Sequence, residues 1–238
     1  MNDKERLNMR KFWGVYKNES YSVGCNGSTV YIYDSTGTEL AKFRDFPYAY
    51  TAVFKPNSNV IAVKSTDGFL GFYDLDSLTL IKKITVTRAG AQDEGFAFTP
   101  DGRYFYNIEK PDNSCQTQLS IYDAVSFERM KTLFTNEKKM VLDNLEFDKE
   151  TGVCYILGFM RSDANGVFDY GFVGKLDVER GSVTDCYALD AKQYYYLQWY
   201  KAWEETGFTE KEFERNPLNK LENIESTSIK EIFDSAKA

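Results

Sequence analysis

A repeated strand that ends in aspartate constrains the fold of this chain more than any other feature. Four short runs of aliphatic and aromatic residues end in this way, at Tyr31–Asp34, Gly71–Asp74, Ser120–Asp123 and Gly174–Asp177. The four aspartates are 40, 49 and 54 residues apart. A period of this length, in segments rich in Val, Ile, Tyr and Phe, is typical of repeated four-stranded sheets and not of a helical repeat.

An aromatic residue just before a turn marks the start of each repeated unit. These residues are Tyr16, Phe54, Phe98 and Phe147. Turn signals divide each unit into four strands, which we call A to D. In the second unit they predict strands over 51–54, 60–64, 69–74 and 80–86, with a hairpin turn at Thr66-Asp67-Gly68. The sequence therefore predicts an all-β domain over residues 1–190.

Two segments of the third unit resemble a known family of repeats. Phe98-Thr99-Pro100-Asp101-Gly102, followed by Arg103-Tyr104, is similar to the element that opens blades in WD-repeat-like and YVTN-type β-propellers. Ile121-Tyr122-Asp123, followed by residues 127–132, resembles the turn between the last two strands of those blades. The resemblance covers residues 12 to 190 and implies a propeller-like body of about four four-stranded antiparallel blades. The Gly-His pair of WD-repeat blades is missing, and both a closed ring and an open stack fit the pattern.

The pattern changes after residue 190. Tyr196, Trp199, Tyr200 and Trp203 share one face of a helix. Thr209-Glu210-Lys211-Glu212 and Ser228-Ile229-Lys230-Glu231 are typical of helix starts with a capping box. We therefore expect residues 191–238 to form a helical C-terminal appendage, whose aromatic stripe packs on the body or faces a partner.

The residue types that are missing exclude several chemistries. The chain has no histidine, which excludes Ser-His-Asp and Cys-His catalysis and every zinc site built with imidazole. Cys25, Cys115, Cys154 and Cys186 lack C-x-x-C spacing, so we expect reduced thiols, with a pair of disulfides as the alternative. The glycine-rich phosphate loops are also missing. We expect neither a metal nor a cofactor.

The charge distribution narrows the choice of partner. The chain has 29 Lys and Arg against 36 Asp and Glu, and its densest basic spots, Lys82-Lys83 and Lys138-Lys139, are only two residues long. Nucleic acid is therefore not the expected partner. No apolar run reaches the roughly 18 residues that a membrane helix needs. The charged segment Met1–Arg6 is not followed by an apolar stretch, so we expect a cytoplasmic protein that does not bind membranes.

Loop lengths indicate where a partner could bind. From the strand-A aromatic residue to the strand-C aspartate, the distance grows from 18 and 20 residues in the first two units to 25 and 30 in the last two. The growth falls between strands B and C, over 110–118 and 160–170. In propellers these loops share a face with the D–A connections, and long loops on a rigid scaffold often carry function. The alternative is that loop length varies here without any function.

We expect a protein partner on this face, with contacts from polar and aromatic loop residues: Arg88, Asp93, Glu94, Asp112, Asn113, Arg161, Asp163 and Tyr170. Tyr48 and Phe168 are further aromatic candidates on the same rim. The predicted function is a non-catalytic protein-interaction module. The alternatives are an enzyme that uses Asp, Glu, Arg or Tyr in the propeller channel, and a small acidic inhibitor or immunity-type protein that neutralises a basic partner.

Overall fold

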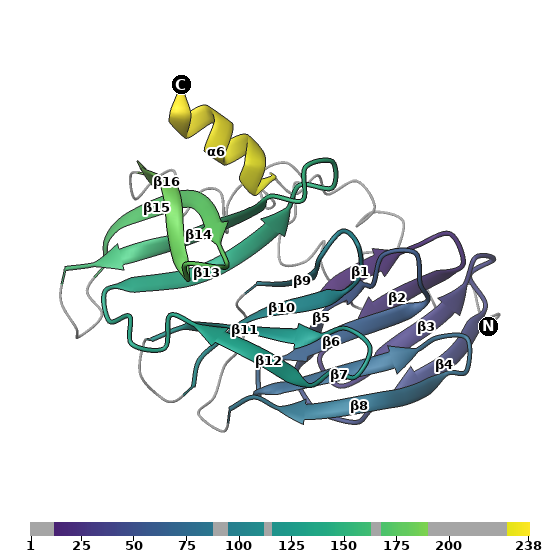
Figure 1. Cartoon of the computed structure of the whole chain (residues 1–238). Coiled ribbons are helices and arrows are strands. Elements are labelled where there is room, and N and C mark those ends of the chain that lie inside the picture. The colour runs from purple at the N-terminus through teal and green to yellow at the C-terminus, as the bar shows by residue number, and fades with distance from the viewer. Residues whose placement is uncertain (1–11, 88–94, 112–115, 163–167, 190–227) are drawn as a thin grey trace, which may run out of the picture. The chain divides into compact units, whose positions relative to one another are not determined.

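The computed structural model of the chain describes residues 12–87, 95–111, 116–162, 168–189 and 228–238. Within these residues the protein has four four-stranded antiparallel sheets and one short helix (Figure 1). The prediction of an all-β fold with repeated four-stranded units is therefore confirmed.

The first two sheets contain β1 to β8, and in each sheet the strands follow in chain order. Their bounds are β1 Gly14–Lys17, β2 Tyr21–Cys25, β3 Val30–Asp34 and β4 Glu39–Phe43, then β5 Ala49–Phe54, β6 Val60–Ser65, β7 Phe69–Asp74 and β8 Thr79–Thr85. The observed strands of the second sheet start within two residues of the predicted ones. The alternation of apolar and polar side chains, together with the turn residues, is therefore sufficient to locate these strands.

The last two sheets contain β9 to β16 in the same order of strands. Their bounds are β9 Phe96–Phe98, β10 Tyr104–Glu109, β11 Gln118–Asp123 and β12 Arg129–Leu133, then β13 Met140–Phe147, β14 Cys154–Arg161, β15 Phe168–Asp177 and β16 Ser182–Leu189. The fourth sheet has the longest strands, because β14 and β15 continue into the segment that the sequence predicts as a loop.

Strand pairing shows that the four sheets are built on one repeat. Each strand-A aromatic residue pairs with the residue seven positions further along the chain: Tyr16 with Val23, Phe54 with Ile61, Phe98 with Phe105 and Phe147 with Cys154. Equivalent residues of the four units therefore occupy equivalent positions in the sheets.

The aspartates that end the third strands shape the turns that follow them. The Asp34 carboxylate accepts hydrogen bonds from the backbone N–H groups of Thr36 and Thr38, both at 2.9 Å. The carboxylates of Asp74, Asp123 and Asp177 accept backbone N–H groups of their own turns in the same way. The repeated aspartates therefore make local hydrogen bonds within their own turns, as is typical of this residue type.

The chain divides into two compact units, each containing two sheets. In the first unit, which includes residues 12–87, the two sheets share one apolar core around Val23, Ile32, Ile61 and Val63, and β1 lies beside β5. In the second unit, which includes residues 95–189 with their gaps and 228–238, the third and fourth sheets share a core around Ile108, Leu119, Ile156 and Phe172. There β9 lies beside β13. Each unit therefore contains two sheets that pack with their first strands adjacent.

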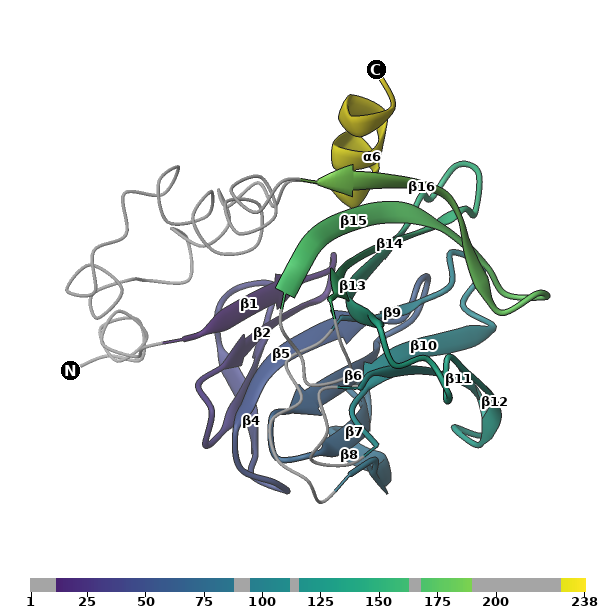
Figure 2. The ribbon, with the colours of Figure 1, turned by 90° about the vertical axis from the view of Figure 1, so that its left-hand side faces the viewer.

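The helix α6, Ile229–Lys237, lies on the fourth sheet (Figures 1 and 2). It begins where the sequence predicts the last helix. Ile229, Ile232 and Phe233 are buried against β14, β15 and β16. The capping box is not formed, because the Ser228 side chain makes no hydrogen bond to the helix backbone. The Glu146 carboxylate of β13 caps the helix instead, by accepting hydrogen bonds from Ser228 Oγ at 2.9 Å and from the Ile229 backbone N–H. The other predicted helices lie outside the described residues.

The cysteines of the described residues are free thiols. Cys25 and Cys154 are buried in the cores of the first and second units, and burial raises the pKa of both thiols above the usual range. Cys186 is exposed. Cys115 lies outside the described residues.

Candidate functional site

Most of the predicted contact residues fall outside the part of the chain that the structure describes. These residues are Arg88, Asp93, Glu94, Asp112, Asn113 and Asp163. Arg161 and Tyr170 are described, and neither lies in a loop. Arg161 ends β14, and Tyr170 of β15 pairs with Met160 of β14. The apparent fourth B–C loop is therefore partly an extension of the β14–β15 hairpin.

Arg161 is an internal residue. Its side chain is 3% exposed, and its guanidinium Nη2 donates to the Lys138 carbonyl while its backbone N–H donates to the Lys139 carbonyl at 2.8 Å. Arg161 thus fixes the connection between β12 and β13, and its side chain is buried, not part of an exposed loop as predicted. Tyr170 is 39% exposed, and its role as a contact residue stays a prediction.

An exposed group of three aromatic side chains in the first unit is the clearest candidate surface. This aromatic cluster consists of Trp13, Tyr48 and Tyr50. The ring centroids of Trp13 and Tyr50 are 5.7 Å apart with a 75° angle between the rings, and those of Tyr48 and Tyr50 are 6.4 Å apart with a 45° angle. Trp13 is 54% exposed and Tyr48 is 53% exposed, and the central Tyr50 is partly buried. Large aromatic side chains exposed together are typical of interaction sites.

Neighbouring turns hold the aromatic cluster in place. Ala49, between the two tyrosines, forms a β-bridge with Gly27 in the B–C turn of the first sheet. Gly27 has φ of 86°, and a Cβ atom there would lie 2.6 Å from the Tyr50 ring, so only glycine fits. The Thr66 backbone N–H, in the B–C turn of the second sheet, donates to the Tyr48 carbonyl at 3.1 Å.

The aromatic cluster therefore lies where B–C turns meet the starts of the A strands, which is the kind of sheet end on which the sequence predicts a partner site. Tyr48 was a predicted aromatic candidate on this rim. Trp13 and Tyr50 were not predicted, because a short motif does not show that the first residues of two different A strands lie side by side. The sequence features that could have indicated this cluster are the tryptophan directly before β1 and the Tyr-x-Tyr spacing at the start of β5.

Tyr48 also has an unusual backbone conformation. Its φ of 55° lies in the left-handed region, which is uncommon for a bulky residue and costs on the order of 1–3 kcal/mol. Residues held in this way by their surroundings tend to occur at ligand-binding sites. The structure thus fixes the exposed ring of Tyr48 at a cost in stability.

A buried polar network in the third sheet is a second arrangement of functional side-chain types. Glu109 at the end of β10 is fully buried, and its Oε1 accepts hydrogen bonds from Ser120 Oγ at 2.6 Å and from Gln118 Nε2 at 2.8 Å. Its Oε2 accepts from Asn107 Nδ2 at 2.8 Å. The carboxylate is therefore held by donors of its own sheet.

Tyr122 and Arg129 complete this network. The Tyr122 hydroxyl lies 3.3 Å from Glu109 Oε2, and Arg129 Nη2 lies 3.5 Å from Glu109 Oε1. Burial, together with the nearby Glu109 charge, raises the pKa of Tyr122 to about 12. Asn107 Oδ1 is the one buried side-chain oxygen of the described residues that has no hydrogen-bond partner. A carboxylate with this many donors is a structural anchor and gives no support to catalysis.

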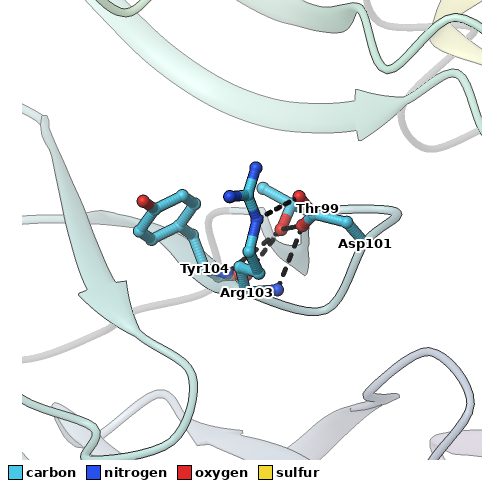
Figure 3. A network of polar contacts seen from close by, with 4 residues as sticks. All are labelled: Thr99, Asp101, Arg103 and Tyr104. Atoms are coloured by element: carbon cyan, nitrogen blue, oxygen red, sulfur yellow. Dashed lines mark hydrogen bonds and ion pairs between the residues drawn. The ribbon is translucent and has the colours of Figure 1, made fainter.

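The turn that carries the propeller-like motif forms a local network (Figure 3). Thr99 Oγ1 donates to Asp101 Oδ1 at 2.6 Å, and the Arg103 guanidinium donates to Asp101 Oδ2 at 2.6 Å. The Thr99 hydroxyl, the Arg103 backbone N–H and the Arg103 guanidinium lower the pKa of Asp101 to about 2. These residues contact one another within one turn, so the motif shapes the connection between β9 and β10.

The described residues lack two further kinds of feature. They contain no group of three or more His, Cys, Asp or Glu side chains that could hold a metal ion. They also contain no helix long and apolar enough to cross a membrane.

Among the comparisons with known proteins, only the one with solved structures bears on the architecture. No family model and no curated protein sequence matches the chain. Among solved structures, the hydrazine synthase of Kuenenia stuttgartiensis is similar, with a TM-score of 0.62 and 13% sequence identity. The match covers 76% of this chain and 50% of that chain, so this chain spans about half of that protein. In all, 1046 solved chains match. At 13% identity the likeness supports a β-propeller-like all-β fold and says nothing about activity.

Proposed function

We propose that this chain is a non-catalytic protein-interaction module that binds a protein partner at the ends of its sheets where B–C turns meet the A strands. The observation that carries the proposal is the aromatic cluster of Trp13, Tyr48 and Tyr50 in the first unit. Trp and Tyr side chains are enriched among the residues that dominate binding energy at protein interfaces. Two rings that are more than half exposed offer a large apolar area for a partner to bury.

The chemistry of the described residues supports binding over catalysis. The Glu109 carboxylate, which is the best-enclosed acid, is occupied by donors of its own sheet. The aromatic cluster has tyrosine rings whose hydroxyl groups can hydrogen-bond to a polar partner while the ring faces are buried. This combination suits a protein surface better than a phosphate backbone or a lipid.

The test is a comparison of three baits in a pull-down from the native cell, followed by binding measurements with the purified captured protein. The baits are wild type, the double variant Trp13→Ala/Tyr48→Asn, and the control Lys17→Ala/Glu19→Ala near the opposite end of β1. Asparagine tolerates the left-handed backbone of Tyr48, so the variant removes the ring without adding strain. We expect the partner to bind wild type and the control, and not the aromatic double variant.

The opposite pattern would overturn the proposal. A partner that is lost with Lys17→Ala/Glu19→Ala and kept with Trp13→Ala/Tyr48→Asn would place the working surface at the A–B turns. Thermal unfolding of each bait shows that it is folded before the binding results are compared.

A further inference from the structure

We propose that the aromatic cluster binds a proline-rich segment of the partner in the polyproline II conformation, with a basic residue of that segment beside Asp67. This inference rests on the proposed function and names the chemistry of the partner.

The ring angles disfavour a flat ligand. The Trp13 and Tyr50 rings are inclined by 75°, and the Tyr48 and Tyr50 rings by 45°. A sugar or a nucleic-acid base stacks on a ring face, and several of them in a row need rings that are roughly parallel. Inclined rings instead form ridges, between which the compact pyrrolidine rings of proline pack. Proline-rich segments are recognised by aromatic side chains in this way.

The ring spacing matches a polyproline II helix. Successive centroids in the cluster are 5.7 Å and 6.4 Å apart. Polyproline II rises about 3.1 Å per residue, so residues two apart are separated by about 6.2 Å along the axis. With three residues per turn, two of every three residues lie on one face. One proline would therefore pack on the surface groove over the Trp13 and Tyr50 pair, and a second on the groove over the Tyr50 and Tyr48 pair.

The polar groups of the cluster also fit this ligand. A polyproline II segment has no internal hydrogen bonds, so its carbonyl groups accept hydrogen bonds from a partner. The hydroxyl groups of Tyr48 and Tyr50 make no hydrogen bond to any part of the chain that the structure describes. These hydroxyls can donate to the carbonyls of the segment while their rings contact proline.

Charge complementarity favours a basic residue at one end. Asp67 is exposed and follows Thr66, whose backbone N–H donates to the Tyr48 carbonyl. Among the described residues Asp67 forms no ion pair. The Arg44 side chain reaches the B–C turn of the first sheet, where its Nε donates to Thr29 Oγ1 at 3.1 Å. A basic residue of the segment is therefore attracted to the Asp67 end and repelled from the Arg44 end, which sets the direction of the bound segment.

The experiment measures the fluorescence anisotropy of labelled peptides titrated with the full chain. The main probe is a proline run that carries one arginine. The comparison peptides are the proline run without arginine, the same sequence with alanine in place of proline, and an arginine-containing Gly-Ser peptide. We expect binding of both proline peptides, stronger for the one with arginine, and no binding of the other two.

Variants of the protein locate the binding site. Trp13→Ala and Tyr48→Asn should each weaken binding of the proline peptides by about tenfold or more. Asp67→Asn should weaken only the arginine-containing proline peptide, by about threefold, because a solvent-exposed ion pair contributes little. Ile81→Ala removes another large exposed side chain of the same unit, 46% exposed on β8, and should leave binding unchanged.

Three results would overturn the inference. These are no binding of proline peptides at millimolar protein, equal binding of the alanine or Gly-Ser peptides, and unchanged binding by Tyr48→Asn. The last variant decides the question even if Trp13→Ala does not fold. If the pull-down partner still needs Trp13 and Tyr48 while proline peptides fail, the interaction module stands and the proline-rich ligand does not.

Discussion

Replacing Phe233 by alanine should release α6 from the fourth sheet. The helix has 9 residues, fewer than the roughly 12–15 that an isolated helix needs in water, so its order depends on docking. Phe233 is 2% exposed, and its ring centroid lies 5.0 Å from that of Tyr155 and 5.3 Å from that of Tyr187. Lys175 Nζ lies 5.0 Å from the same ring. No other side chain of the helix makes as many aromatic contacts with the sheet.

The size of the effect follows from these contacts. Truncation of a buried Phe to Ala costs about 3–5 kcal/mol when the site cannot collapse. The two other buried anchors of the helix are Ile229 and Ile232. Because a 9-residue helix is not stable on its own, its order depends on these three side chains, and losing the Phe233 ring removes the largest of them.

Hydrogen exchange followed by mass spectrometry measures this release directly. In wild type, the backbone amides of 232–237 should be protected, as the hydrogen bond from Ile232 N–H to the Ser228 carbonyl indicates. In Phe233→Ala they should exchange at the rate of an unstructured chain, while β14 and β15 stay protected. Asp234→Ala, an exposed neighbour in the same helix, is the control and should keep its protection. Unchanged protection of 232–237 in Phe233→Ala would refute the docking argument.

Three further predictions test the repeat, an ion pair and the thiols. Phe98→Ala should destabilise the protein by about 3–5 kcal/mol in urea unfolding, because Phe98 is 5% exposed and packs on Phe105. An unchanged urea concentration at the unfolding midpoint would contradict the repeat alignment. Lys230 Nζ lies 2.7 Å from Asp148 Oδ2 and helps to lower the pKa of the Asp148 carboxyl to about 2. The ion pair therefore stabilises α6 fully at a pH above the ordinary carboxyl pKa of about 3.8. This stabilisation is lost as the pH falls towards 2. Asp148→Asn should therefore reduce the protection of α6 at pH 7 and have little effect at pH 2. Intact mass with and without reductant should be identical, since we expect four reduced cysteines and each disulfide would remove two hydrogens.

The sequence by itself determined the strands, the repeat and the turns. Strand boundaries follow from alternating side chains and turn residues, which act over a few positions. Asp34 and Asp123 mark strand ends in the sequence because a carboxylate at that place bonds to backbone N–H groups only two to four residues away. The register of Phe54 and Phe98 follows from turns of similar length, so the fold class was readable without tertiary information.

The tertiary structure alone decided which side chains are buried, which are exposed together and what caps α6. Arg161 looked like a loop residue, yet the continued pairing of β14 and β15 places its guanidinium against the Lys138 carbonyl. Glu146 replaces the expected Ser228 cap although it lies far away in the sequence. Trp13 and Tyr50 meet because β1 and β5 lie side by side. Contacts of this kind depend on how sheets pack, and packing joins residues that no local pattern relates.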